Sequence, residues 1–380
     1  VDNATLHRSQ SELDAAYAAE MVRQQVIAKF GLKAYTEGYT AITTIDSSTQ
    51  ASAVSAVQSG IRAYDKRHGY RGAELKNIDP TTWRETLRKT LIIGLLQPAI
   101  ITSVHDDRLI LLKKNGESAI LNWADGLDSL RLFKTVNARS PLIDSAASIF
   151  ETGDLIRIEE HENGRVTLAQ IPLIQSAMVA LDPFNGAIRA LVGGFDYRQS
   201  TFNRATQATR QPGSNFKPFI YTTALKNGFT TASIINDAPV VFEDAKLEDT
   251  WRPENDGGKF YGPTRLREAL YRSRNLVSIR LLRRMGVDRT LESLQSFGFN
   301  TSNMPSDLSV ALGSHALKPI DIATGYAMFA NDGFRVNSHI LDRVIDRNGN
   351  VIFQAQPELA CDPCKPENIR DNQLPQTSNN

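Results

Sequence analysis

The sequence contains little of what marks several large classes of protein. Its 380 residues include two cysteines and six histidines, and no two histidines share a metal-ligand spacing. The 43 basic and 42 acidic residues nearly cancel, and no long basic run is present. We therefore predict no metal, no cofactor and no nucleic-acid partner.

Long apolar runs are also missing. The longest, at 91–96, is broken by Gln97 and Pro98 and is too short to span a bilayer. Residue 1 is Val1 rather than methionine, and no signal-peptide pattern follows it. These features predict a processed piece of a longer protein, and localisation has to be inferred from function.

Both cysteines, Cys361 and Cys364, fall in a polar, proline-rich segment at 356–380. A C-x-x-C redox motif needs a strand–helix junction, and no helical pattern follows this one. The segment favours a small disulfide loop in an oxidising compartment, and a redox site or half of a zinc site is the alternative.

Length and pattern changes divide the chain into regions. A chain this long exceeds one ordinary core, so two or three domains are expected. We predict five segments: a linker and N-terminal part at 1–45, a helical part at 46–96, a β-barrel insertion at 97–172, a second domain at 173–355, and a flexible polar tail or insertion at 356–380.

The barrel is predicted from short, evenly spaced strands. Turn residues separate the β-rich runs 99–104, 109–112, 118–121, 153–158 and 165–169. Five or six such strands in this length are typical of a small barrel of the OB type. With no basic stripe and few exposed aromatics, it is interpreted as a protein-contact or spacer module.

The remaining chain mixes strands and helices. An almost wholly apolar hairpin at 177–192, with Asn185-Gly186 at its turn, is expected at the centre of a sheet covered by helices. Further elements are predicted as helices at 17–30, 49–66, 83–91, 214–226, 265–271, 276–285, 288–297 and 319–330, and as a strand at 39–45.

The stretch from Arg210 to Phe219 carries the clearest chemical signal. It places Ser214 and Lys217 three residues apart at the start of a helix, so both face the same side. An amine in that position can take the hydroxyl proton and make the serine a nucleophile. The helix N-terminus also favours developing negative charge, and a neighbouring amide suits an oxyanion hole.

Each motif alone has an ordinary structural explanation. Ser214 could be a helix cap and Lys217 a solvated surface lysine. Ser273 and Asn275 lie between two amphipathic helices, where they could relay a proton and hold a substrate amide. A second helix cap is the alternative for that pair.

Taken together, the motifs resemble the transpeptidase family of penicillin-binding proteins. The hairpin at 177–194, the QPGSNFKPF stretch at 211–219 and the segments 311–314 and 322–333 follow the family's pattern. The insertion at 97–172 is similar to that of Gram-negative class A, bifunctional enzymes of the 1A type. The resemblance implies an α+β penicilloyl-serine transferase fold, a mixed sheet covered by helices, plus the small OB-like barrel.

The resemblance also implies roles for the motif residues. Ser214 would attack the D-Ala-D-Ala carbonyl of a peptidoglycan stem peptide, with Lys217 as general base. Ser273 and Asn275 would serve proton transfer and substrate positioning. A neighbouring stem amine would resolve the acyl-enzyme into a cross-link, and β-lactams would acylate Ser214 and leave slowly.

One family motif does not occur. Lys-Thr-Gly, which binds the substrate carboxylate, is absent from the 380 residues. The domain at 173–355 is therefore expected to be incomplete, and the isolated chain to be inactive. The glycosyltransferase domain and membrane anchor of a class A enzyme would precede Val1, which places the parent protein on the periplasmic side of the inner membrane. An outer-membrane lipoprotein activator is a further implied partner, for the barrel.

Two rival functions stay open at this stage. A β-lactamase or β-lactam sensor shares the fold, but no Glu-x-x-Leu-Asn segment follows Ser273 to activate a deacylating water. A non-catalytic interaction fragment would explain the missing third motif. Slow, stable acylation by penicillin separates the transpeptidase from both.

Overall fold

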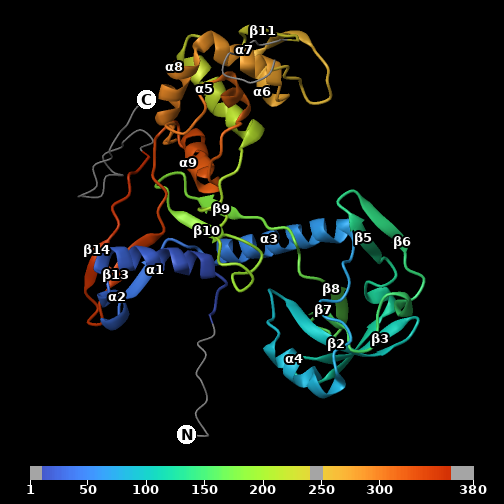
Figure 1. Cartoon of the computed structure of the whole chain (residues 1–380). Coiled ribbons are helices and arrows are strands. Elements are labelled where there is room, and N and C mark those ends of the chain that lie inside the picture. The colour runs from blue at the N-terminus through green and yellow to red at the C-terminus, as the bar shows by residue number, and fades with distance from the viewer. Residues whose placement is uncertain (1–10, 240–250, 361–380) are drawn as a thin grey trace. The chain divides into compact units, whose positions relative to one another are not determined.

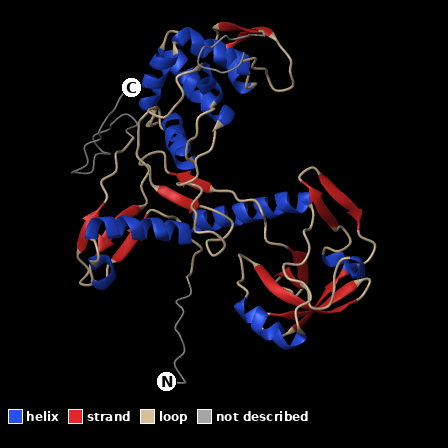
Figure 2. Ribbon diagram, viewed as in Figure 1, coloured by secondary structure: helices blue, strands red, loops and turns tan. Residues whose placement is uncertain are grey.

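The computed structural model describes residues 11–239 and 251–360, and its chain divides into two compact units. The first unit takes in residues 1–50, 177–192 and 203–380. The second takes in residues 51–176 and 193–202. Cys361 and Cys364, for which a disulfide is predicted, lie outside the described residues. Figures 1 and 2 show the elements of both units.

The first unit contains one three-stranded sheet, two strand pairs and a group of helices. Its helices are α1 (Ala16–Phe30), α2 (Lys33–Thr36), α5 (Lys217–Lys226), α6 (Leu266–Tyr271), α7 (Asn275–Met285), α8 (Val287–Gln295) and α9 (Pro319–Ala330), with 3-10 helices η4 (Gly213–Phe216) and η5 (Leu308–Leu312). Its strands are β1 (Thr40–Thr43), β9 (Met178–Leu181), β10 (Ile188–Val192), β11 (Ile234–Asp237), β12 (Gly262–Arg265), β13 (Leu341–Ile345) and β14 (Val351–Gln354).

The apolar hairpin forms as predicted, but not at the centre of a larger sheet. Among the described residues, β9 and β10 pair with each other, and one isolated bridge joins Ala187 to His339. The three-stranded sheet is built instead from β1, β13 and β14, all antiparallel. Helix α9 contacts β9 and helix α1 contacts β10, so the apolar residues of the hairpin are those of two strands that pack against helices.

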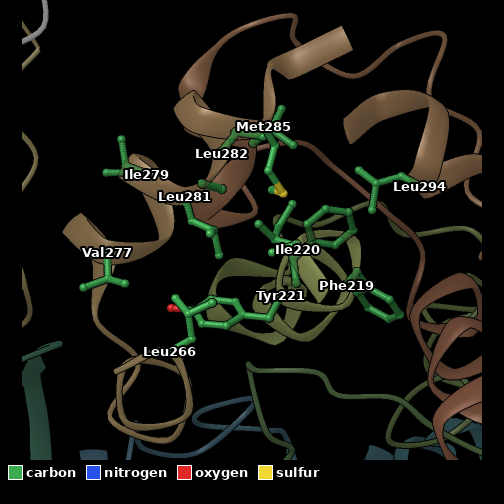
Figure 3. Packing of buried hydrophobic residues seen from close by; sticks show 14 of the residues in the cluster. Phe219, Ile220, Tyr221, Leu266, Val277, Ile279, Leu281, Leu282, Met285 and Leu294 are labelled. Atoms are coloured by element: carbon green, nitrogen blue, oxygen red, sulfur yellow. The ribbon is translucent and has the colours of Figure 1, made fainter. Parts of the chain in front are cut away.

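Helix α5 lies in the core of the first unit. Phe216, Phe219, Ile220 and Ala224 are fully buried, which confirms the predicted apolar face. Figure 3 shows α5 side chains meeting those of α7, with Leu294 of α8 beside them. Asn227 and Gly228 end the helix as expected, with Gly228 at a φ of 85°. This buried face fixes the helix that carries Lys217, and with it the residues just before the helix.

The second unit holds the barrel and most of a long helix. Its helices are α3 (Ser47–His68, which belongs to this unit from residue 51) and α4 (Trp83–Lys89), with 3-10 helices η1 (Pro80–Thr82), η2 (Trp123–Asp125) and η3 (Ala146–Ser148). Its strands are β2 (Leu96–Val104), β3 (Arg108–Lys113), β4 (Ser118–Asn122), β5 (Arg131–Thr135), β6 (Ala138–Leu142), β7 (Leu155–Glu160) and β8 (Val166–Ala169).

Five of these strands form one antiparallel sheet in the order β4-β3-β2-β7-β8, packed around a cluster of buried apolar side chains. Its two edge strands, β4 and β8, contact one another, which gives the barrel-like closure expected from the sequence. The separate hairpin of β5 and β6 was not predicted, because its residues are half-buried or exposed and carry no alternating apolar pattern.

Across residues 11–239 and 251–360, the structure contains no helix with both the length and the apolar character needed to span a bilayer.

Candidate active site

The two predicted motifs meet in the first unit. Ser214 lies in the 3-10 helix η4, and Lys217 is the first residue of α5. Ser273 lies in the turn between α6 and α7, and Asn275 is the first residue of α7. The structure thus brings together all four residues predicted from the sequence.

A continuous set of hydrogen bonds joins them. Lys217 Nζ donates to Ser273 Oγ at 2.8 Å, to the Ser273 carbonyl at 2.7 Å and to Asn275 Oδ1 at 2.7 Å. Ser273 Oγ in turn lies 2.9 Å from Ser214 Oγ. The Lys217 backbone N–H donates to the Ser214 carbonyl, but among the described residues no hydrogen bond joins Lys217 Nζ directly to Ser214 Oγ, so the two side chains are linked through Ser273. The direct contact expected from their spacing is replaced by this bridge.

The environment of Lys217 makes its ammonium group more acidic than that of an ordinary lysine. The residue is 1% exposed, and burial lowers the pKa of its amine from 10.5 to about 8. Its three hydrogen-bond acceptors are all neutral groups, so no carboxylate holds the proton on. A substantial fraction of the amine is therefore neutral near physiological pH.

The neutral amine has one arrangement that fits these contacts. It carries two N–H groups and one lone pair, and two of its neighbours are carbonyl oxygens that can only accept. Both N–H groups are thus taken by the Ser273 carbonyl and Asn275 Oδ1. The lone pair is left facing Ser273 Oγ, which can then accept a proton from Ser214 Oγ.

The turn at Ser273 is held in a conformation that most residues avoid. Its φ is 54°, in the left-handed region, which costs about 1–2 kcal/mol for a residue with a side chain. Backbone hydrogen bonds from Ser273 to Leu270 (2.9 Å) and from Arg274 to Ala269 (2.8 Å) fix it. This conformation presents both the carbonyl and the hydroxyl of Ser273 to Lys217.

The backbone before Ser214 packs against a second loop at very close range. A Cβ atom on Gly313 would lie 2.3 Å from the Gly213 carbonyl oxygen, so no side chain fits there. The Gly213 amide also donates to the Gly313 carbonyl at 3.2 Å. On the other side of η4, the Tyr326 hydroxyl of α9 donates to the Asn215 carbonyl at 2.8 Å. The turn that carries Ser214 is thus held by contacts with two other elements.

Sequence reasoning missed His315, which lies behind the same turn. Its ring is 6% exposed and packs edge-on against Phe216 with centroids 4.3 Å apart. Burial lowers the pKa of His315 to about 4, so it packs as a neutral ring. Neither ring nitrogen has a hydrogen-bond partner among the described residues. A single histidine gives no pattern by which the sequence could have identified it.

A separate cleft lies within the second unit. It has a volume of about 1030 Å³ and is lined by the end of α3, by η2, by β8 and by residues around the β5–β6 hairpin. Its walls include four cationic side chains that form no ion pair with any described carboxylate: Lys66, Arg67, Arg131 and Arg139. Among its acidic residues, Asp65, Asp125 and Glu159 are already paired with arginines.

The charge of this cleft is therefore unbalanced. Asp128 is the one acidic residue of its described lining without an ion pair, against four such cations. The cations come from three separated segments, so the sequence shows no basic stripe. The cleft is built to attract anionic groups rather than an uncharged surface.

Comparison with known proteins agrees with both units. The family model described as "Penicillin binding protein transpeptidase domain" matches residues 176–373, and that described as "Penicillin-binding protein OB-like domain" matches residues 70–174. Penicillin-binding protein 1A of Pseudomonas aeruginosa is 45% identical over 357 residues, which cover 93% of this chain and 43% of that protein. The protein of the same name from Escherichia coli is 39% identical over 369 residues, covering 95% and 43%.

The fold agrees as well. The crystal structure of penicillin-binding protein 1A from Haemophilus influenzae aligns with a TM-score of 0.83 at 36% identity, and the alignment covers 94% of this chain and 52% of that one. This confirms the predicted α+β penicilloyl-serine transferase fold with its OB-like barrel. The chain spans less than half the length of the curated relatives named above. It belongs to the transpeptidase family of penicillin-binding proteins, and carries that family's transpeptidase and OB-like domains.

Proposed function

We propose that this chain carries the serine acyl-transfer site of a peptidoglycan D-Ala-D-Ala transpeptidase. The observation that carries the proposal is the hydrogen-bond chain from Lys217 through Ser273 to Ser214. A buried amine with its pKa lowered to about 8, joined by one hydroxyl to an exposed serine, is the arrangement that an activated nucleophile needs.

Acylation follows from this geometry. Ser214 Oγ attacks the carbonyl carbon of the penultimate D-Ala, and its proton passes through Ser273 to neutral Lys217. The backbone N–H of Ser214 is proposed as one donor to the oxyanion that forms. The proton then returns through Ser273 to the nitrogen of the terminal D-Ala as the C–N bond breaks, leaving an acyl ester on Ser214.

Deacylation reverses the same path with a new nucleophile. An amine of a neighbouring stem peptide gives up a proton to the Lys217–Ser273 pair and attacks the ester carbon. The Ser214 ester bond breaks as Ser214 Oγ takes that proton back through Ser273, and a peptide cross-link forms. Water as acceptor would give carboxypeptidase activity at the same site. The Asn275 side-chain amide is proposed to position the substrate's peptide group.

Binding of β-lactams rests on the same chemistry. Attack by Ser214 opens the lactam ring, so the leaving nitrogen stays attached and the acyl-enzyme is long-lived. The family's name describes this behaviour. We propose that benzylpenicillin is a stable covalent inhibitor of this protein.

The test uses the complete gene product with a peptide donor ending in D-Ala-D-Ala and a peptide acceptor carrying a free amine. A transpeptidase releases D-Ala and forms the donor–acceptor amide. A carboxypeptidase releases D-Ala without the amide, a β-lactamase instead turns over benzylpenicillin, and a non-catalytic module does neither. Absence of both D-Ala release and the amide product would contradict the proposal.

Location and parent activity are part of the same proposal. The resemblance to class A enzymes favours a periplasmic site on the inner membrane and a glycosyltransferase in the complete gene product. Protease accessibility of the OB-like domain in spheroplasts, but not in intact cells, is the expected result for the location.

For the OB-like domain we propose a protein partner, an outer-membrane lipoprotein activator. What supports a partner here is the cleft, whose unpaired cations Lys66, Arg131 and Arg139 would attract an acidic segment. Reversing two of them, Arg131→Glu with Arg139→Glu, should weaken capture of the lipoprotein several-fold, and more at low salt. Arg84→Glu with Arg88→Glu, on exposed positions of α4, makes the same charge change outside the cleft and should not. Equal loss from both pairs would contradict docking in the cleft.

A further inference from the structure

We propose that Asn255 and Asp237 are positioning residues for the proposed acyl transfer: a buried pair that caps α7 from outside and so holds Asn275 and Ser273 in register with Lys217. Neither residue belongs to the Ser-x-x-Lys or Ser-x-Asn motif. Both lie in the first unit, Asp237 at the end of β11 and Asn255 in the loop that leads to β12.

Asn255 supplies a cap that helix α7 lacks in its own sequence. The residue before the helix, Arg274, makes no side-chain hydrogen bond to its first amides. Instead, Asn255 Oδ1 accepts from the backbone N–H of Asn275 at 2.8 Å and lies 3.5 Å from that of Leu276. A side chain 20 residues away in sequence thus does the work of a local N-cap.

Asp237 fixes which way the Asn255 amide points. Its carboxylate is fully buried and can only accept hydrogen bonds when ionised. Asn255 Nδ2 donates to both of its oxygens, at 2.8 and 2.9 Å, and to the Lys259 carbonyl at 2.9 Å. With Nδ2 held there, Oδ1 has to face α7. The negative charge of Asp237 polarises the Asn255 amide, which makes its Oδ1 a stronger acceptor for the amides of α7.

One residue, Asn275, connects this cap to Lys217. The Asn275 amide nitrogen is held by Asn255, and the Asn275 side chain receives the hydrogen bond of Lys217 Nζ at 2.7 Å. The Asn275 Nδ2 group is also anchored, to the Glu254 carbonyl at 2.9 Å. Because Asn275 Oδ1 takes one of the two N–H groups of the neutral amine, its position decides where the lone pair of Lys217 points.

The strained turn depends on the same cap. Ser273 keeps its left-handed φ of 54° only while the residues on both sides of it are held. On the α6 side the backbone hydrogen bond from Arg274 to Ala269 holds it, and on the α7 side Asn255 does. Release of the α7 end would let the turn relax and carry Ser273 Oγ away from Lys217 and Ser214.

The test compares four variants of the complete gene product: Asn255→Ala, Asn255→Asp, Asp237→Asn, and the swap that combines the last two. Asn255→Ala removes the cap, and Asn255→Asp sets two carboxylates against each other. In the swap, the amide introduced at position 237 is expected to donate to the carboxylate introduced at position 255, which again accepts from the Asn275 amide. Asn331→Ala is the control for loss of an asparagine side chain, because Asn331 donates to the carbonyls of Pro183 and Phe334, outside this network.

Two readouts are used, both below the unfolding temperature of each variant. The first is hydrogen exchange of the Asn275 backbone amide, which needs no enzymatic activity. The second separates the benzylpenicillin dissociation constant from the rate constant of acylation. Asn255→Ala should speed exchange and slow acylation by about 10- to 100-fold, as expected for a misplacement of about 1 Å, with the dissociation constant little changed. The swap should recover part of both losses, because the Lys259 carbonyl loses its donor and Arg274 loses the carboxylate 4.0 Å from its Nε.

A loss of thermal stability in Asn255→Ala like that in Asn331→Ala, with exchange and acylation unchanged, would overturn the proposal. So would failure of the swap to exceed both single variants. If the unaltered protein is not acylated at all, the proposed function fails instead, and the exchange measurement still decides whether Asn255 caps α7.

Discussion

The proposed active site and the OB-like cleft differ in the surroundings of their cationic side chains. Lys217 is buried among neutral acceptors, so its pKa is lowered and its proton becomes mobile. The cleft cations Lys66, Arg67 and Arg139 lie exposed to water. Arg157 represents a third kind of cation, because it is buried like Lys217 but is paired with the Glu74 carboxylate at 2.8 Å. Burial and partner together therefore distinguish the proposed catalytic cation from the proposed docking cations and from a structural cation.

The largest effect is expected from removing the buried amine. Lys217→Met keeps the apolar stem but deletes the base, so acylation by benzylpenicillin should fall by roughly 10²–10⁴-fold. Arg139→Met, the corresponding loss of a cation in the cleft, should leave acylation unchanged. Stopped-flow or gel-based measurement of the acylation rate constant checks both. A comparable fall of the acylation rate constant in both variants would contradict the distinction between the buried amine and the cleft cations.

Arg157→Met tests the structural cation. It leaves Glu74 without its partner, and the carbonyls of Leu91 and Leu96 lose a donor. Because Glu74 stays a third exposed, the loss comes mainly from the carbonyls left without a donor and should cost about 1–3 kcal/mol, so the second unit should unfold at a lower denaturant concentration. Penicillin acylation at low temperature should persist, because Arg157 belongs to the other unit. Loss of acylation in a still-folded protein would contradict the separation of roles.

The close approach of two glycines tests how tightly the nucleophile is held. In Gly313→Ala the new Cβ would meet the Gly213 backbone, at a cost of about 1–3 kcal/mol and with a shift of the Ser214 turn. Gly333→Ala is the control, since Gly333 also has a positive φ but open space around it. Gly313→Ala should lower the acylation rate well beyond Gly333→Ala. Equal acylation rates in the two variants would mean that the turn holding Ser214 can shift without loss of reactivity.

The pH dependence of acylation gives the smallest of the expected effects. With the pKa of Lys217 lowered to about 8, roughly a tenth of the amine is neutral at pH 7. Since the neutral form is the base, the rate constant should rise about tenfold between pH 7 and pH 9.5 and level off above the pKa. A rate that falls over this range would show that protonated Lys217 is the active form.

The four residues of the proposed site could be selected from the sequence because each pair lies within one short motif. Ser214 and Lys217 are fixed by helical spacing, and Ser273 and Asn275 by a two-residue turn before a helix. Their bridge through Ser273 could not be predicted, because it depends on how α7 packs against α5. Asn255 and His315 were missed for the same reason: each acts through a contact made across the fold.

The fold shows the same limit. Helices such as α5, α7 and α9 follow from apolar periodicity and were placed within a few residues. The short strands β11 and β12 were missed, because their pairing is set by position rather than by composition. The cleft could not be predicted for a further reason: its cations lie in three segments that are separated in the sequence and meet only in the folded unit.

The most direct test of the central claim is peptide-mapped mass spectrometry after brief exposure of the complete gene product to benzylpenicillin. The account predicts a stable penicilloyl adduct on the peptide that holds Ser214, absent in Ser214→Ala and much slower to form in Lys217→Met. An adduct on another residue, or none in a folded and complete protein, would contradict it.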